Sequence, residues 1–141
     1  MASELTYWVD RCLGTNIVPQ ALRAIGVHIE TYDSLYPNDT RVADHVWIPE
    51  VARRGWVILT KDKRIRHASV EIEALRGARA RYVCLSAANL TGPEQADCLV
   101  KHWKTIDSVV VNKPVPLIVS VTRQNVQWHD GRAWRVAKRK R

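Results

Sequence analysis

Three aspartates occupy matching positions in this chain: Asp10, Asp44 and Asp62. Asp10 ends the apolar run Tyr-Trp-Val, Asp62 ends the longer run Trp-Val-Ile-Leu-Thr-Lys, and Asp44 lies near the start of a predicted helix between them. Carboxylates that gather in one place repel one another unless a cation neutralises them. Ligands that offer only oxygen favour Mg²⁺ or Mn²⁺. The three aspartates therefore indicate a metal-dependent enzyme.

Basic side chains around Asp62 form a second group of residues that could do chemistry. Lys61, Lys63, Arg64 and Arg66 would lie beside the acids, where they could hold a polyanionic backbone. The alternative is an ordinary solvated loop. A cation held by several aspartates activates water for attack on phosphate esters, so the acids and bases together favour a nuclease.

Short apolar runs alternate with stretches of helical spacing along the chain. Apolar runs rich in β-branched residues predict strands at 6–9, 27–32, 56–60, 81–86 and 116–122. Helices are predicted from the cap Asn16 to Gly26, over 41–54, from Ser69 to an end at Gly77, and from Pro93 to about residue 108. The polar segment 33–40 is predicted as a loop, and the end of the chain, through Trp128 and a turn at 129–131, as a hairpin. This order predicts an α/β fold, a three-layer α/β/α sandwich with a mostly parallel central sheet.

In such a sheet, ligands bind beyond the carboxyl ends of the strands. Asp10 and Asp62 would meet there if their two strands are neighbours, and Asp44 begins a helix near the same edge. Asp44 leads the apolar stripe that contains Trp47 and Ile48, so it should point inward and need a partner. The alternatives are that Asp44 caps the helix or favours its dipole, and that Asp10 and Asp62 are turn formers.

The bulk properties exclude several classes of protein. A chain of 141 residues with 46% apolar residues is expected to form one domain with a sizeable core. We expect no membrane contact and no export, because no apolar run approaches the roughly 20 residues of a membrane span and no signal region opens the chain. Three cysteines without a Cys-x-x-Cys pair fit a reducing cytoplasm. No zinc-type histidine spacing, phosphate loop, GxGxxG or GxSxG motif occurs.

The formal net charge of +8 is concentrated at the C-terminus. The last ten residues contain no acid, and the rest of the chain keeps a formal charge of only +2. The basic residues of this segment are Arg132, Arg135, Lys138, Arg139, Lys140 and Arg141. Such a tail suits a phosphate backbone, although similar runs are common as solvated ends. We therefore expect a domain over residues 1–128 and a basic tail over 129–141.

Four segments resemble the PIN-like domain family. They are Tyr-Trp-Val-Asp10-Arg11-Cys-Leu-Gly14, Val-Pro19-Gln-Ala-Leu22-Arg23-Ala-Ile-Gly26, Asp44-His-Val-Trp47-Ile and Gly55-Trp-Val-Ile-Leu-Thr60-Lys61-Asp62-Lys-Arg64-Ile65. Their order and spacing are similar to the short PIN-like branch found among VapC-type toxins of bacterial toxin–antitoxin modules. The resemblance covers roughly residues 6–122.

The resemblance implies a Mg²⁺- or Mn²⁺-dependent endoribonuclease that serves as the toxin of a type II toxin–antitoxin system. It implies that Asp10, Asp44 and Asp62 bind the metal with the help of a fourth acid. Glu71 is our candidate for the fourth acid, and Asp39 is the alternative. Glu50 should face elsewhere, because it lies about 240° around the helix from Asp44.

The partners implied by the resemblance are RNA, a cognate antitoxin protein and a second copy of the chain in a homodimer. The residues expected to bind RNA are Arg11, Lys61, Lys63, Arg64 and Arg66. The competing hypothesis is a non-catalytic module of PIN-like fold that binds nucleic acid or a protein, in which the acids are structural.

Overall fold

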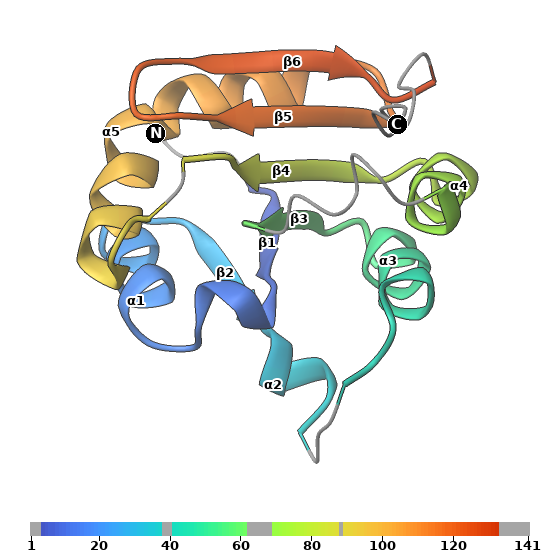
Figure 1. The fold of residues 1–141 in the computed structure, drawn as a ribbon, viewed down its shortest axis with the longest axis horizontal. Helices are drawn as coiled ribbons and strands as arrows, with labels where there is room; N and C mark the ends of the chain where they lie inside the picture. The colour runs from blue at the N-terminus through green and yellow to red at the C-terminus, as the bar shows by residue number, and fades with distance from the viewer. Residues whose placement is uncertain (1–3, 38–40, 62–68, 88, 133–141) are drawn as a thin grey trace, which may run out of the picture.

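The structure, a computed structural model, describes residues 4–37, 41–61, 69–87 and 89–132 (Figure 1). The strands are β1 (Thr6–Val9), β2 (His28–Thr31), β3 (Val57–Thr60), β4 (Arg81–Leu85), β5 (Leu117–Val121) and β6 (Val126–Asp130). The helices are α1 (Ile17–Ala24), α2 (Tyr32–Leu35), α3 (Asp44–Arg53), α4 (Ser69–Ala78) and α5 (Gly92–Asn112), with a short 3-10 helix over Arg11–Leu13. Strands and helices alternate as the sequence predicts.

The strands form one sheet in the order β2-β1-β3-β4-β5-β6. Neighbouring strands from β2 to β5 are parallel, and only β6 is antiparallel to its neighbour. Val9 lies opposite Leu59, so β1 and β3 end side by side. Because the chain crosses from β2 to β3 over β1, the order of the strands reverses here, and the carboxyl edge at such a point is where ligands bind. The predicted α/β fold with a mostly parallel sheet is confirmed.

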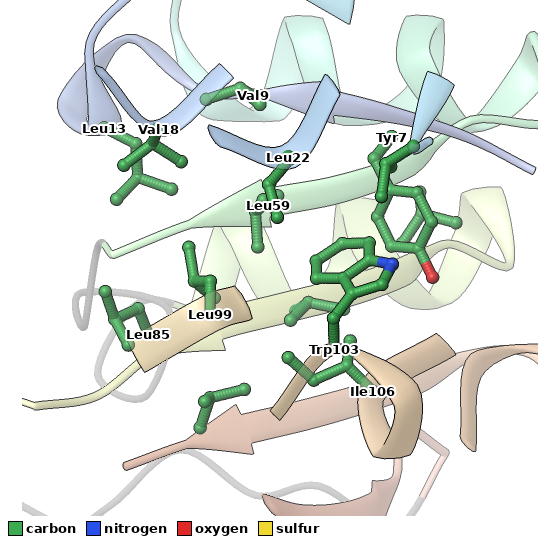
Figure 2. Close-up of a cluster of buried hydrophobic side chains, with 14 of the residues drawn as sticks. Tyr7, Val9, Leu13, Val18, Leu22, Leu59, Leu85, Leu99, Trp103 and Ile106 are labelled. Carbon is green, nitrogen blue, oxygen red and sulfur yellow. The ribbon is translucent and has the colours of Figure 1, made fainter. Parts of the chain in front are cut away.

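Both faces of the sheet are buried, because successive side chains of a strand point to opposite sides. Tyr7 and Val9 belong to the core under α1 and α5, whereas Trp8 belongs to the core under α3 and α4. In Figure 1, α1 and α5 lie together to the left of the strands and α3 and α4 together to the right. Figure 2 shows the first core, in which Leu22 of α1 and Leu99 of α5 approach the strands.

Near the carboxyl edge, two details of the prediction are wrong and a third is right in position only. The predicted loop after β2 begins with α2, in which the Tyr36 amide donates to the Tyr32 carbonyl at 2.9 Å. Helix α3 begins at Asp44 instead of residue 41, because Ala43 is still extended (φ −63°, ψ 146°). Asn16 is the N-cap residue of α1, as predicted, but its side chain makes no capping hydrogen bond.

At the ends of α4 and α5 and in the hairpin, the boundaries also differ from the prediction. Helix α4 passes through Gly77, and Arg79 takes the left-handed conformation (φ 54°) expected of a terminal glycine. Helix α5 continues to Asn112. The hairpin exists, but its turn lies between β5 and β6, where the Thr122 amide donates to the Asn125 carbonyl at 2.9 Å.

Strand β6 includes residues 129 and 130, so the sheet reaches into the segment predicted as the tail. Residues 133–141 lie outside the described part of the chain, and the division into domain and tail stays a prediction. Within the described ranges, no helix combines the length and the apolar character needed to cross a membrane.

Candidate functional site

A cleft of about 640 Å³ opens at the carboxyl edge of β1. Its lining includes three carboxylates, those of Asp10, Asp44 and Glu71, and two guanidinium groups, those of Arg11 and Arg41. The acids come from the end of β1, the start of α3 and the first turn of α4. The fold thus brings three acids that are far apart in sequence to one hollow, which we call the acidic cleft.

Asp10 is the most buried of the three acids, with 8% of its surface exposed. Its amide donates to the Leu59 carbonyl at 2.9 Å, which continues the pairing of β1 with β3 by one residue. Its Oδ1 accepts from the Arg11 amide at 2.7 Å, so Asp10 also caps the 3-10 helix. The turn-forming role considered for Asp10 is therefore real, and it aims the same carboxylate into the cleft.

Thr60 and Cys12 hold the second oxygen of Asp10. The fully buried Thr60 hydroxyl donates to Oδ2 at 2.9 Å, and the Cys12 thiol donates to it at 3.3 Å. The Cys12 sulfur also lies 3.2 Å from the Thr60 hydroxyl and accepts weakly from the Lys61 amide at 3.4 Å. Burial, and then the Asp10 carboxylate, raise the pKa of the Cys12 thiol to about 12. Cys12 is consequently a neutral donor at physiological pH. The hydrogen bonds among Asp10, Cys12 and Thr60 connect the end of β1 to the end of β3.

Asp44 is half-buried at the first position of α3. Its Oδ1 accepts from the indole Nε1–H of Trp47 at 2.9 Å. Ala43, and not Asp44, is the capping residue of the helix. The prediction that Asp44 points inward and has a partner agrees with this geometry, although the sequence did not indicate that the partner is an indole.

The cleft includes one candidate for the fourth acid and excludes Glu50. Glu71 is half-buried, lines the cleft and makes no hydrogen bond or ion pair within the described ranges. Glu50 instead pairs with Arg53 at 2.8 Å and with Arg54 at 2.9 Å, as expected for a side chain on another face of α3. Asp39, the alternative to Glu71, lies outside the described residues.

The basic residues predicted to bind RNA are only partly described. Arg11 is exposed, lines the cleft and lies over the Tyr32 ring, 5.8 Å from its centroid. Lys61 is exposed directly after β3. Asp62, Lys63, Arg64 and Arg66 fall outside the described residues, so their predicted roles stay predictions.

The donor set of the cleft can be compared with the needs of a metal ion. Carboxylate oxygens are the ligands that Mg²⁺ and Mn²⁺ prefer, and the described lining of the cleft contains three carboxylates and no histidine. Within 4–37, 41–61, 69–87 and 89–132, no three His, Cys, Asp or Glu side chains are close enough to hold an ion by themselves. The cleft therefore offers the kind of donor that Mg²⁺ or Mn²⁺ prefers. Its described acids by themselves do not complete a metal site.

Several residues of the site are not indicated by the sequence patterns. Arg41 is exposed on the rim of the cleft, and among the described residues it has no hydrogen bond or ion pair. Thr60 could have been noticed as the polar end of an apolar run, and Trp47 as a donor three residues after Asp44. Nothing in the sequence signals Cys12, because its contact with Thr60 joins residues 48 positions apart.

Comparisons with known proteins agree with the geometry. The family described as PIN like domain matches residues 5–87, a range that contains the three acids of the cleft. Over 91 residues, the chain is 35% identical to a protein of Mycobacterium tuberculosis (strain ATCC 25618 / H37Rv) whose name is "Putative ribonuclease VapC45". This match covers 63% of the chain and 66% of the relative, slightly less than two thirds of its length. No solved structure matches the chain.

Proposed function

Because this chain belongs to the PIN-like domain family, we propose that it is a Mg²⁺- or Mn²⁺-dependent endoribonuclease that cleaves RNA at the acidic cleft. The single observation that carries the proposal is the convergence of Asp10, Asp44 and Glu71 on one hollow at the carboxyl edge of the sheet. The 35% identity to a protein named as a ribonuclease supports the same reaction.

In this proposal, Asp10, Asp44 and the undescribed Asp62 hold the cation, and Glu71 assists them. When bound, the cation would activate water and stabilise negative charge on the phosphate. Asp10 suits its role because Thr60 and the Arg11 amide fix both of its oxygens. A carboxylate fixed in this way loses little freedom when it binds an ion.

Positive side chains at the rim of the cleft would bind the RNA backbone. Arg11 and Arg41 line the cleft, and Lys61 follows β3 beside the Cys12 sulfur. Guanidinium groups can form two hydrogen bonds to one phosphate. We propose that Arg11 and Lys61, together with the undescribed Lys63, Arg64 and Arg66, position the strand that is cut, and we add Arg41 to this group.

The decisive experiment is replacement of Asp10 by Asn. We expect the purified Asp10→Asn variant to keep its fold by circular dichroism and to lose cleavage of a labelled RNA, because the amide removes the charge but keeps the shape. Asp97→Asn is the matched control, since Asp97 is an exposed acid on α5 away from the acidic cleft. Full activity of Asp10→Asn, or cleavage by the wild type in excess EDTA, would contradict the proposal. Binding of RNA without cleavage by the wild type would favour a non-catalytic module.

We further propose that the protein is the toxin of a type II toxin–antitoxin system, with an antitoxin and a second copy of the chain as partners. The support is the likeness to a protein whose name contains VapC and ribonuclease. Growth arrest on expression of the wild type, absent for Asp10→Asn, is the expected observation. Growth arrest by both the wild type and Asp10→Asn would show that toxicity does not depend on the acidic cleft.

A further inference from the structure

One buried side chain that touches the acidic cleft has no role in the function proposed above. Trp47 has only 2% of its surface exposed, yet it lines the cleft. Its Nε1–H donates to Asp44 Oδ1 at 2.9 Å. We propose that Trp47 is a positioning residue, whose indole N–H fixes the Asp44 carboxylate for cation binding. The proposal rests on the metal-dependent function, because it concerns a proposed metal ligand.

The surroundings of Trp47 allow little movement of its ring. The ring packs on Trp8 with centroids 4.9 Å apart and planes inclined by 41°. Trp8 in turn lies 5.7 Å from the ring of Tyr32, whose hydroxyl accepts from the Val42 amide at 2.9 Å. The indole N–H is therefore a donor held by a packed aromatic cluster, and it approaches Asp44 from inside the protein.

The contact between Trp47 and Asp44 lies within the first turn of α3. Ala43 is the capping residue of α3, and its side chain makes no capping hydrogen bond. Residues three apart on a helix are neighbours, so the indole of Trp47 can reach back to the carboxylate of Asp44. Partners that hydrogen-bond to a metal ligand orient it, and their loss costs about 10–100-fold in metal affinity.

Trp8 provides a matched control in the same cluster. It is fully buried, and its Nε1–H has no hydrogen-bond partner in the part of the chain that the structure describes. Trp47→Phe and Trp8→Phe therefore remove the same atoms from two rings that pack on each other at an angle. Only the first substitution removes a donor to Asp44.

The test measures Mn²⁺ binding without RNA, by the electron paramagnetic resonance signal of free Mn²⁺. We expect Trp47→Phe to weaken binding about 10–100-fold and Trp8→Phe to bind as the wild type does, with both variants folded by circular dichroism. In RNA cleavage, Trp47→Phe should need correspondingly more Mn²⁺ and recover most of its rate when Mn²⁺ is saturating. Equal weakening in the two variants, or none in Trp47→Phe, would overturn the proposal.

A second measurement uses the wild type and does not depend on the folding of a variant. In nitrogen-15 spectra, the indole N–H signal of Trp47 should shift on titration with Mg²⁺ and that of Trp8 should not. An unchanged Trp47 signal at saturating Mg²⁺ would refute the positioning role. A wild type that binds neither ion would instead refute the proposed metal site itself, as would unchanged binding in Asp10→Asn.

Discussion

Thr60 provides the sharpest test of how the fold prepares Asp10 for its role. Its hydroxyl donates to Asp10 Oδ2 at 2.9 Å, and the side chain is completely buried. Replacement by Val keeps the shape of the side chain and removes the hydroxyl. The Cys12 thiol, a weaker donor, also contacts this oxygen at 3.3 Å.

The expected cost of Thr60→Val follows from burial and charge. A hydrogen bond to a charged group contributes about 1.5–3 kcal/mol to stability, and water cannot replace the hydroxyl at a fully buried position. Because Val and Thr have nearly the same shape, the substitution leaves almost no cavity, and the cost comes from the lost hydroxyl. We expect the free energy of unfolding to fall by about 1.5–3 kcal/mol and Tm to fall by about 5–10 °C. The loss of orientation at Asp10 should reduce RNA cleavage about 10–100-fold.

Denaturant unfolding and RNA cleavage together test this reasoning. The control is Thr60→Ser, which keeps the hydroxyl and deletes a methyl group. It should cost about 0.5–1.5 kcal/mol of stability and retain most of the cleavage rate. If Thr60→Val cleaved RNA as fast as the wild type, the hydroxyl would be structural only. If Ser and Val lowered cleavage equally, packing and not the hydrogen bond would govern Asp10.

Two further predictions concern other parts of the molecule. Tyr7→Phe removes a buried hydroxyl that donates to Asp107 at 2.7 Å, so the free energy of unfolding should fall by about 1–3 kcal/mol with cleavage retained. Burial raises the pKa of Tyr7 above its ordinary 10.0, so this stabilisation is complete below pH 10 and declines at higher pH. The difference in unfolding free energy between the wild type and Tyr7→Phe should therefore narrow above pH 10, and a difference that widens there would contradict this reasoning. Glu71→Gln should lower cleavage about 10–100-fold, whereas Glu50→Gln, a change in an acid that pairs with its own helix, should not. Equal rates in these two variants would remove Glu71 from the site.

Much of the fold could be predicted from local patterns. The apolar run before Asp10 indicates a strand, the unbroken run around Ile58 indicates a strand buried on both faces, and helical spacing indicates the covering layers. The ends of helices are harder to predict from sequence, because several residue types can adopt the backbone geometry that ends a helix. Arg79, for example, ends α4 in a left-handed conformation after Gly77 has remained helical.

The candidate site was predictable to the extent that its residues mark the ends of elements. Asp10 follows a strand, Asp44 begins a helix and Glu71 lies in the first turn of another, and the parallel α/β order places such positions at one edge. Asp62 stays a prediction, because it lies outside the described residues. Helical spacing allows the contact between Asp44 and Trp47, which are three residues apart. An inward carboxylate, however, indicates a cation as readily as a neutral donor, so spacing alone does not identify the partner.

The sequence by itself determined the alternation of elements, the PIN-like resemblance and the positions of the acids, because periodicity and element ends are local properties. Tertiary structure decided that β1 lies beside β3 and that Thr60 reaches Asp10 across 50 positions of sequence. It also decided that Glu71 and Arg41 line the same cleft as Asp10. Contacts of this kind depend on which strands pair and how side chains pack, and the local spacing of residues does not determine either.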